Sequence, residues 1–389
     1  MIERPGEGLP AAKSVLNRLL VIRSHCPGGF TIQGDSDCGD VVHLRRGLAA
    51  LGGEGPIDCG EGGAVLRFLA LRASRLPGRH RLTGTARLLS RPREELTALL
   101  AGLGVEAGSG PGGEVVLAGE GWREPAAPLT LDLSRSSQFA SALLLNAWDL
   151  PFPLEIEFTK ERVSEGFLRM TLTLCRRAGM TLAGEERIIV PAGARVEPGA
   201  YRARADQGAA FALAAAAALA GRVVLPAADP LQPDGVYPEI LRAMGVPLHR
   251  AGEELVVERA PRLRPIDRDL GTAPDLVPVL AVLCAFAPGT SRLQGAPHLA
   301  FKESHRIART AGLVRLLGRA CRERPDGLEI EGSAAPPPAG PLPFATDQDH
   351  RLAMAAGVAM KAGWPLRPDA PRVVAKSFPA FWRLIEVVP

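Results

Sequence analysis

The segment ELTALLAGLGVEA, residues 95–107, contains the pattern that decides the fold. Leu and Ala recur at helical spacing up to Gly104, and a short strand-like tail follows at once. A glycine directly after a helix can adopt the left-handed backbone conformation that ends the helix and redirects the chain. The segment therefore predicts a helix that turns into a strand at Gly104.

The same pattern recurs five more times, with turns at Gly52, Gly179, Gly245, Gly318 and Gly363. Successive glycines of the six are 52, 75, 66, 73 and 45 residues apart, which is too irregular for a solenoid. One such turn is common in any α/β protein. Its return from end to end of the chain favours six α/β units of about 60 residues, three in each of two domains.

The length of 389 residues fits two or three domains of about 150 residues each. Residues 196–206 (VEPGAYRARAD) are the best candidate for a crossing between domains. Residues 333–343 (SAAPPPAGPLP) are too rich in proline for a helix or a central strand, so we expect a surface connection there.

Composition excludes several classes of protein. The net charge of +4, from 46 basic and 42 acidic residues, is too small to predict a nucleic-acid partner. The longest apolar runs, 211–220 and 276–288, are shorter than the roughly 18 residues of a membrane span, and the N-terminus lacks the apolar core of a signal peptide. The six cysteines show no metal or disulfide spacing. We therefore expect a cytoplasmic protein without a metal.

Lysine is rare, and its placement is informative. Only five of the 46 basic residues are Lys, and three of these five, Lys13, Lys302 and Lys376, fall in polar segments beside predicted helices or strands. A random scatter of five lysines would seldom do so. Their placement favours a cationic binding site over a merely charged surface.

Three segments place polar groups at predicted helix starts. LPAAKSVLNR holds Lys13, Ser14 and Arg18, DCGEGGAVLRFL is rich in glycine around Gly63, and SRSSQF, residues 134–139, is rich in serine. Helix-end amides, hydroxyls and bare backbone can bind a phosphate. Each segment taken alone could equally be an ordinary capped helix start, and none has the spacing of a nucleotide-binding motif.

The segment FKESHRI, residues 301–307, is expected to hold Lys302, Glu303 and Arg306 within one helical turn. A carboxylate between two cations should be ionised and could exchange a proton with a substrate. A solvated charged turn would have the same composition. Two further segments, TDQDHRLAM with Arg351 and VVAKSFP with Lys376, add cations near apolar helices.

These motifs together resemble the family of 5-enolpyruvylshikimate-3-phosphate synthases, which are enolpyruvyl transferases. Besides the segments above, LTGTARLLSRP, VSEGF, LQPDG, APD and AKSFP occur in family order, and the resemblance runs from residue 9 to 379. It implies an α/β fold, the two-domain inverse α/β barrel, with three βαβαββ units in each domain. Residues 12–203 would carry the serine cluster for shikimate 3-phosphate. Residues 1–11 and 204–389 would carry the catalytic carboxylates and the phosphoenolpyruvate cations.

The resemblance also implies the reaction. The enolpyruvyl group of phosphoenolpyruvate would pass to the 5-hydroxyl of shikimate 3-phosphate, with release of phosphate, in chorismate and aromatic amino-acid biosynthesis. The two small molecules would be the only partners of a monomer, and no metal or organic cofactor is needed. Both substrates are polyanions, so the site should be rich in Arg and Lys.

Individual roles follow from the resemblance. Asp275 would take the 5-hydroxyl proton, Glu303 would transfer a proton at the methylene carbon, and Lys13 would act with them. Gln138 would lie between the two substrates. The residues implied for shikimate 3-phosphate are Lys13, Ser14, Arg18, Ser136, Ser137, Gln138, Ser164, Asp275, His298 and Lys302. The residues implied for phosphoenolpyruvate are Lys13, Gly63, Arg91, Gln138, Arg306, Arg351 and Lys376.

Some positions depart from the family pattern, although none removes an implied proton carrier or phosphate-binding cation. Glu61 replaces the family's usual Asn, Phe167 a Tyr, His298 an Asn and His305 an Asp. The pair Gln207–Gly208 replaces two serines.

Two alternative functions stay open. One is the related UDP-N-acetylglucosamine enolpyruvyl transferase, which usually has Lys-Asn at Lys13–Ser14 and a catalytic cysteine in a loop where TARLLSRP has none. The other is a catalytically impaired, anion-binding homologue, against which the retained pair Asp275 and Glu303 argues.

Overall fold

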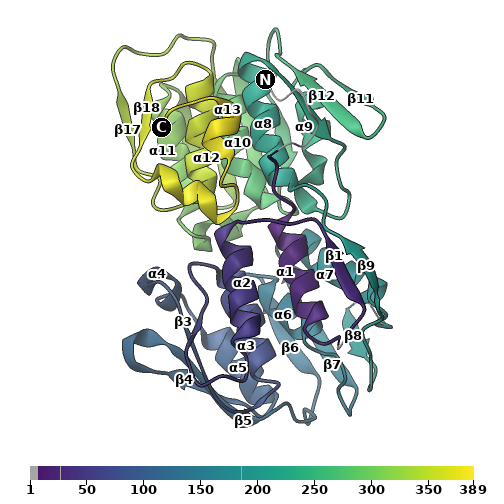
Figure 1. Cartoon of the computed structure of the whole chain (residues 1–389). Helices are drawn as coiled ribbons and strands as arrows, with labels where there is room; N and C mark the ends of the chain where they lie inside the picture. Colours follow the sequence, from purple (N-terminus) through teal and green to yellow (C-terminus); the bar gives the residue numbers. More distant parts are fainter. Residues whose placement is uncertain (1–7, 27, 185) are drawn as a thin grey trace. The chain divides into compact units, whose positions relative to one another are not determined.

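The computed structural model describes residues 8–389 except Pro27 and Glu185, and it leaves out the side chains of residues 159–162. The chain forms two compact units (Figure 1). One unit is Lys13–Ala203, and the other combines the residues up to Ala12 with Arg204–Pro389. The second crossing, after Ala203, lies within the segment 196–206.

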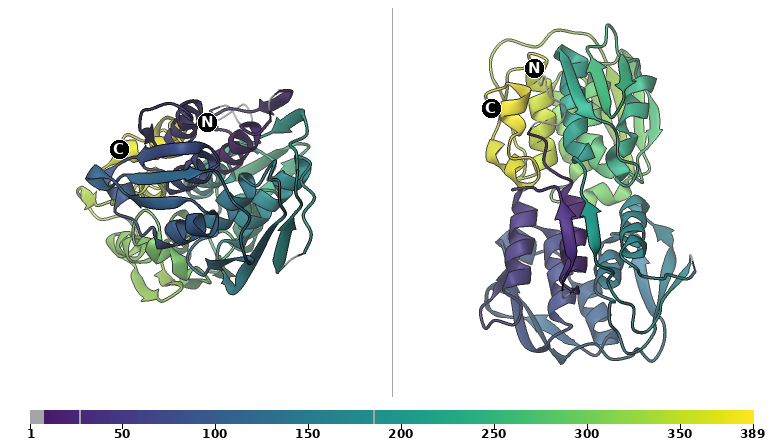
Figure 2. Two further views of the ribbon diagram at one scale, coloured as in Figure 1. Left: turned by 90° about the horizontal axis from the view of Figure 1, so that it is seen from below. Right: turned by 45° about the vertical axis from the view of Figure 1, so that its right-hand side comes forward.

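The unit Lys13–Ala203 combines helices with three small sheets. Its helices are α1 (Lys13–Arg23), α2 (Gly39–Ala49), α3 (Gly63–Ala73), α4 (Ala86–Leu89), α5 (Glu94–Gly102), the 3-10 turn η1 (Pro111–Gly113), α6 (Gln138–Leu145) and α7 (Glu165–Arg177). Its strands are β1 (Phe30–Gln33), β2 (Ile57–Asp58), β3 (Pro77–Thr83), β4 (Glu106–Ser109), β5 (Val115–Glu120), β6 (Leu129–Leu133), β7 (Leu154–Arg162), β8 (Arg187–Val190) and β9 (Gly199–Arg202). The sheets have the orders β1-β9, β2-β3-β5-β4 and β6-β7-β8. Strands β1 and β9 run parallel, side by side (Figure 2).

The other unit also combines helices with three small sheets. Its helices are α8 (Gln207–Ala220), η2 (Pro233–Val236), α9 (Tyr237–Ala243), η3 (Pro274–Leu276), α10 (Val277–Ala285), η4 (Pro297–Phe301), α11 (Arg306–Leu316), α12 (His350–Lys361), η5 (Pro371–Lys376) and α13 (Phe381–Ile385). Its strands are β10 (Arg222–Pro226), β11 (Leu248–Ala251), β12 (Glu254–Glu258), β13 (Asp267–Asp269), β14 (Gly289–Gln294), β15 (Ala320–Arg324), β16 (Gly327–Gly332), β17 (Leu342–Phe344) and β18 (Leu366–Pro368). The sheets have the orders β10-β12-β11, β13-β14-β16-β15 and β17-β18.

Two of the sheets, one in each unit, share a complete βαβαββ topology. In the first, β2 and β3 are parallel neighbours joined through α3, and β4 and β5 form an antiparallel hairpin after α5. In the second, β13, α10, β14, α11, β15 and β16 repeat that order and pairing. The prediction of an α/β fold is confirmed.

Four of the six predicted helix–glycine–strand turns are confirmed, since β4, β11, β15 and β18 begin within three residues of Gly104, Gly245, Gly318 and Gly363. After Gly52 and Gly179 the strands β2 and β8 begin only at Ile57 and Arg187, so the helix does not turn directly into a strand there. All six glycines have positive φ, between 69° and 100°. At Gly318, which follows α11, a Cβ atom would meet nothing within 4 Å. The left-handed backbone, rather than a lack of space, therefore requires glycine there.

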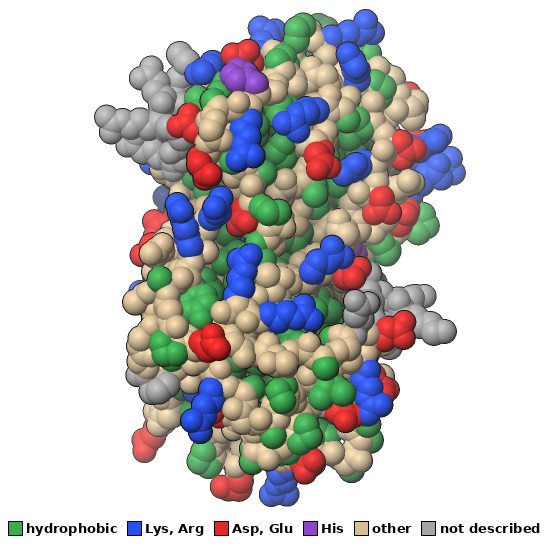
Figure 3. Space-filling model, turned by 90° about the vertical axis from the view of Figure 1, so that its right-hand side faces the viewer, with side chains coloured by type: hydrophobic (Ala, Val, Ile, Leu, Met, Phe, Trp, Pro, Cys, Tyr) green, Lys and Arg blue, Asp and Glu red, His purple; other side chains and the backbone are tan. Residues whose placement is uncertain are grey.

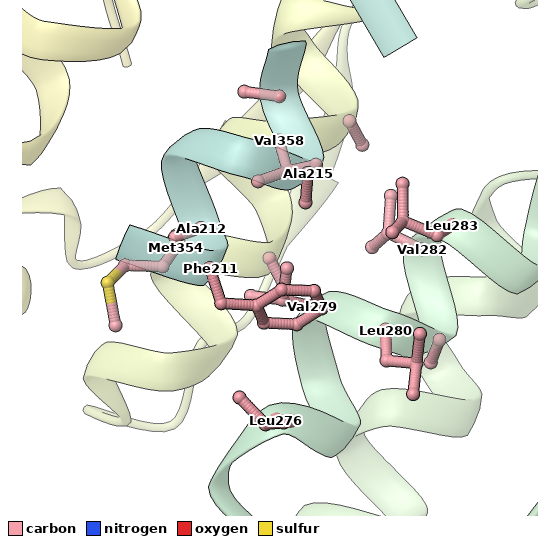
Figure 4. Close-up of a cluster of buried hydrophobic side chains, with 14 of the residues drawn as sticks. Phe211, Ala212, Ala215, Leu276, Val279, Leu280, Val282, Leu283, Met354 and Val358 are labelled. Carbon is pink, nitrogen blue, oxygen red and sulfur yellow. The ribbon is translucent and has the colours of Figure 1, made fainter. Parts of the chain in front are cut away.

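The core of the second unit lies between three helices. Figure 4 shows Phe211 and Ala215 of α8, Leu280 and Leu283 of α10, and Val358 of α12 packed together. Every residue of α10 is buried, as expected for a helix that is apolar all round. Strand β14 alternates buried and exposed residues over its last four positions, so its sheet has one inner and one outer face. No helix in the described part of the chain is long and apolar enough to cross a membrane.

The surface carries charges of both signs. Figure 3 shows basic and acidic side chains interspersed on the face in view. On the sheet that contains β14, Arg292 and Arg324 both reach Glu329, at 3.0 and 2.8 Å. Such exposed ion pairs contribute little stability, but they balance the surface charge.

Candidate active site

Arg306 holds three carboxylates in the unit that contains Arg204–Pro389. Its side chain is 1% exposed. Its Nε donates to Asp349 Oδ2, its Nη1 to Asp275 Oδ1 and its Nη2 to Glu303 Oε2, each at 2.8 Å. Burial lowers the pKa of Arg306, but these carboxylates outweigh burial and raise it well above its usual value. The guanidinium is therefore permanently charged and fixes both predicted proton carriers, Asp275 and Glu303, in place.

Asp275 is held as a carboxylate. It lies in η3, at the start of α10, and its Oδ2 accepts from Arg351 Nη2 at 3.2 Å. Burial raises the pKa of Asp275, but the charges of Arg351, Arg306 and Lys302 together lower it below its usual range. An ionised carboxylate is the form that can accept a proton from an alcohol.

Glu303 contacts a cation with each oxygen, since Lys376 Nζ donates to Oε1 at 3.1 Å. The expectation that Lys302, Glu303 and Arg306 share one helical turn is wrong. Helix η4 ends at Phe301, and α11 begins only at Arg306. His305 caps α11, because its Nδ1 accepts from Ala308 N at 3.2 Å, and the residues before a cap are not helical.

Two predicted contacts of shikimate 3-phosphate, His298 and Lys302, lie close to this cluster. His298 is 2% exposed in η4, and burial, assisted by the charge of Lys302, lowers its pKa to about 3. Burial also lowers the pKa of Lys302, although the charge of Asp275 opposes the shift. His298 is therefore neutral at neutral pH.

Sequence reasoning assigned no role to Asp349 or Asp234. Asp349 is the N-cap of α12 and accepts from Arg351 N at 2.9 Å, while Ser304 Oγ donates to it at 2.9 Å. Asp234 Oδ2 lies 3.7 Å from Arg351 Nη2. The signal for Asp349 was its place directly before an apolar helix. No local signal pointed from Asp234 to Arg351.

In the other unit, α1 begins with Lys13, as predicted. Lys13 Nζ pairs with Asp40 Oδ2 at 2.8 Å, which ties α1 to the first turn of α2. Sequence reasoning also missed Asp40. Arg18 is buried one turn later, and burial lowers its pKa to about 10. Its Nη1 donates to Ser14 O at 2.8 Å and its Nε to Thr171 Oγ1 at 2.7 Å, so it joins α1 to α7.

The predicted serines meet at the starts of α6 and α7. Ser137 Oγ donates to Ser164 O at 3.2 Å, and Ser136 Oγ accepts from Gln138 N at 3.2 Å. Ser164 has a φ of 53°, which is unusual for a residue with a side chain. Such strain persists only where the surrounding structure enforces it, and it is often found at functional sites.

Gly63, Arg91 and Gln138 form a second predicted cluster in this unit. A Cβ atom on Gly63 would lie 2.8 Å from Arg91 Nη1 and 2.9 Å from Arg67 Nη1. Arg67 Nη1 also donates to Gln138 Oε1 at 2.7 Å. Two guanidinium groups therefore meet the N-terminus of α3, an arrangement suited to a phosphate. Arg67 was missed, although its i,i+4 spacing from Gly63 on a helix was a signal.

The structure thus gathers the predicted residues into groups, each within one unit. Among the described residues, no set of three or more His, Cys, Asp and Glu side chains is placed to hold a metal ion. The groups suit the binding of anions and the transfer of protons between a carboxylate and a substrate.

The sequence matches a family model described as EPSP synthase (3-phosphoshikimate 1-carboxyvinyltransferase) over residues 9–385. A 3-phosphoshikimate 1-carboxyvinyltransferase from Syntrophobacter fumaroxidans is 36% identical over 340 residues, covering 85% of this chain and 79% of the relative. The enzyme of that name from Methanosphaerula palustris is 32% identical over 416 residues, and the match covers 97% of this chain and 95% of the relative.

Solved structures share the fold. The EPSP synthase from Acinetobacter baumannii has a TM-score of 0.75 at 22% identity, covering 97% of this chain and 94% of that one. The enolpyruvyl transferase NikO from Streptomyces tendae has a TM-score of 0.74 at 17% identity, and the match covers 97% of this chain and 93% of that one. With a family match over nearly its whole length and relatives above 30% identity, the chain belongs to the EPSP synthase family.

Proposed function

We propose that this chain transfers the enolpyruvyl group of phosphoenolpyruvate to the 5-hydroxyl of shikimate 3-phosphate and releases phosphate, as a 3-phosphoshikimate 1-carboxyvinyltransferase. The observation that carries the proposal, beyond family membership, is the pair of carboxylates on Arg306. Asp275 and Glu303 each accept at 2.8 Å from a different nitrogen of one buried guanidinium.

The steps balance with the chain's own residues. Asp275 takes the 5-hydroxyl proton while the hydroxyl oxygen bonds to C2 of phosphoenolpyruvate, and Glu303 delivers a proton to the methylene carbon. The tetrahedral intermediate then loses phosphate from C2 and returns a proton from the methyl carbon to Glu303, which restores the double bond, and the proton held by Asp275 leaves with the phosphate. Cations stabilise the negative charge throughout.

The remaining cations and hydroxyls would hold the substrates. We assign Lys13, Gly63, Arg91, Gln138, Arg306, Arg351 and Lys376 to phosphoenolpyruvate. We assign Lys13, Ser14, Arg18, Ser136, Ser137, Gln138, Ser164, Asp275, His298 and Lys302 to shikimate 3-phosphate. Within the α/β class, we propose the inverse α/β barrel with three βαβαββ units in each domain. The serine cluster would lie in residues 12–203 and the carboxylates in the other domain. We further propose a monomer that works in the cytoplasm.

Residues 85–92 (TARLLSRP) contain no cysteine, which disfavours the related cell-wall transferase, because that family usually has a catalytic cysteine in this loop. Three cysteines elsewhere in the chain are also unsuited to that role. Burial raises the pKa of Cys175 and of Cys284 to about 12 and that of Cys59 further still. Such thiols are poor nucleophiles at neutral pH.

A coupled assay of phosphate release tests the proposal. We expect release with phosphoenolpyruvate and shikimate 3-phosphate together, and none with UDP-N-acetylglucosamine as the acceptor. Binding of both substrates without phosphate release would instead identify an impaired homologue.

A further inference from the structure

Gly208 occupies a place in α8 where a side chain would collide with Arg351 and Asp234. It is buried, one residue after the start of the helix at Gln207. A Cβ atom there would overlap Arg351 Nη1 and would lie 2.7 Å from Asp234 Oδ2 and 3.0 Å from Arg351 Nη2. These contacts are closer than packed side chains tolerate.

The helix itself does not need a glycine at this position. Gly208 is not among the glycines with positive φ, and α8 is otherwise rich in alanine. Glycine in a helix is less stable than alanine, because it loses more conformational freedom on folding. The neighbour Gln207 turns its side chain elsewhere, with Nε2 donating to Ala205 O at 3.1 Å. The local sequence therefore offers no reason for Gly208.

The side chain of Arg351 has little freedom to move away from α8. It is 5% exposed, and its Nη2 donates to Asp275 at 3.2 Å and lies 3.7 Å from Asp234. Its Nε atom is buried and has no hydrogen-bond partner among the described residues. A guanidinium beside the positive end of a helix is unfavourable unless carboxylates offset it. Asp275, which is held as a carboxylate, supplies that offset.

We infer that Gly208 is a positioning residue for Arg351. The missing side chain leaves the space in which the guanidinium lies between Asp234 and Asp275, in the orientation that binds phosphoenolpyruvate. The role of Arg351 in this inference rests on the proposed function, whereas its position in the fold does not.

The test compares Gly208→Ala with the control Gly312→Ala. Gly312 is an exposed glycine of α11 at which a Cβ would meet nothing within 4 Å. In Gly208→Ala the KM for phosphoenolpyruvate should rise by about tenfold or more, the scale of one charge-assisted hydrogen bond. Its KM for shikimate 3-phosphate and its melting temperature should stay close to wild type. The control should match the wild type in both KM values.

A double-mutant cycle separates positioning from helix packing. Arg351→Lys removes the Nη1 atom but leaves Asp234 in place, so Gly208→Ala should raise the KM for phosphoenolpyruvate by a smaller factor in that background. An equal loss in both backgrounds, or an unchanged KM for phosphoenolpyruvate in Gly208→Ala, would overturn the inference.

A crystal structure of Gly208→Ala gives a readout that does not depend on activity. We expect the guanidinium of Arg351 to have left Asp234, and an unmoved guanidinium would overturn the inference. Failure of the wild type to release phosphate would overturn the proposed function alone.

Discussion

Asp349 shows how much a single residue can organise. Its Oδ2 accepts from Arg306 at 2.8 Å and from Ser304 at 2.9 Å, while its Oδ1 accepts from the backbone N–H of Arg351. The side chain is fully buried, so it must be paired with cations and donors to remain charged. One carboxylate thereby sets the position of two arginines of the candidate site.

Asp275→Asn keeps the size of the side chain but removes the base. We expect turnover to fall by about two to four orders of magnitude, the usual scale of general acid–base catalysis. Phosphoenolpyruvate should still bind in the presence of shikimate 3-phosphate, as measured by a ligand-induced thermal shift. Near-normal phosphate release would remove Asp275 from the mechanism.

Glu303→Gln separates the second carboxylate from the first. The amide keeps the size of the side chain and one of the two oxygens that accept from Arg306 and Lys376, but it cannot deliver the proton. We therefore expect both substrates still to bind. We expect the exchange of solvent deuterium into the methylene position of phosphoenolpyruvate to disappear. Mass spectrometry of recovered phosphoenolpyruvate measures this exchange, and its persistence would assign the proton to another group.

At the scale of elements, helix starts determine most of the site. Helices α1, α3, α6 and α11 begin with Lys13, Gly63, Gln138 and Arg306, respectively. The first turn of a helix offers unpaired N–H groups and a positive potential, which suit anionic substrates. The fold therefore supplies binding groups that no side chain needs to provide.

The cap of α11 provides a prediction at this scale. His305→Asp should stabilise the protein by roughly 0.5–1 kcal/mol, because Asp is a better N-cap and its charge complements the helix dipole. Urea unfolding measures the change. His249→Asp is the control, since His249 is also exposed but lies in β11, where Asp is disfavoured. An equal gain in both variants would show a general charge effect instead.

At the scale of the whole molecule, folded stability should depend on buried neutral histidines. Burial lowers the pKa of both His25 and His298 to about 3. Below about pH 6.5 the unfolded chain binds protons that the folded chain does not, so these residues make stability fall as the pH falls. Asp234 acts in the opposite sense, because burial raises its pKa to about 7 and folding then favours its protonated form.

His25→Gln isolates one of these contributions. Between pH 7.5 and 5.5 the wild type should lose about 1 kcal/mol more of its free energy of unfolding than the variant does. Asp234 contributes equally to both proteins, so the difference between them reports His25 alone. Denaturant unfolding at the two pH values measures it, and parallel losses would show that His25 is protonated in the folded state.

Local features of the sequence were enough to predict the α/β class and most turns of the repeat. At Gly104 and Gly318, for example, helical spacing and the glycine itself specify the turn, because both depend on neighbouring residues only. The motifs likewise identified Asp275, Glu303 and three of the lysines as candidate site residues, because a motif is defined by residue type and order alone.

Only the tertiary structure decided which side chains meet. Arg67 reaches Gln138 across 71 residues, Lys13 reaches Asp40 across 27, and Arg306 reaches Asp349 across 43. None of these partners is a neighbour in a helix or a strand, so no periodicity reveals them. Each pair forms because packing of the helices brings together side chains that are distant in the sequence, and buried charged groups are stable only when they have partners.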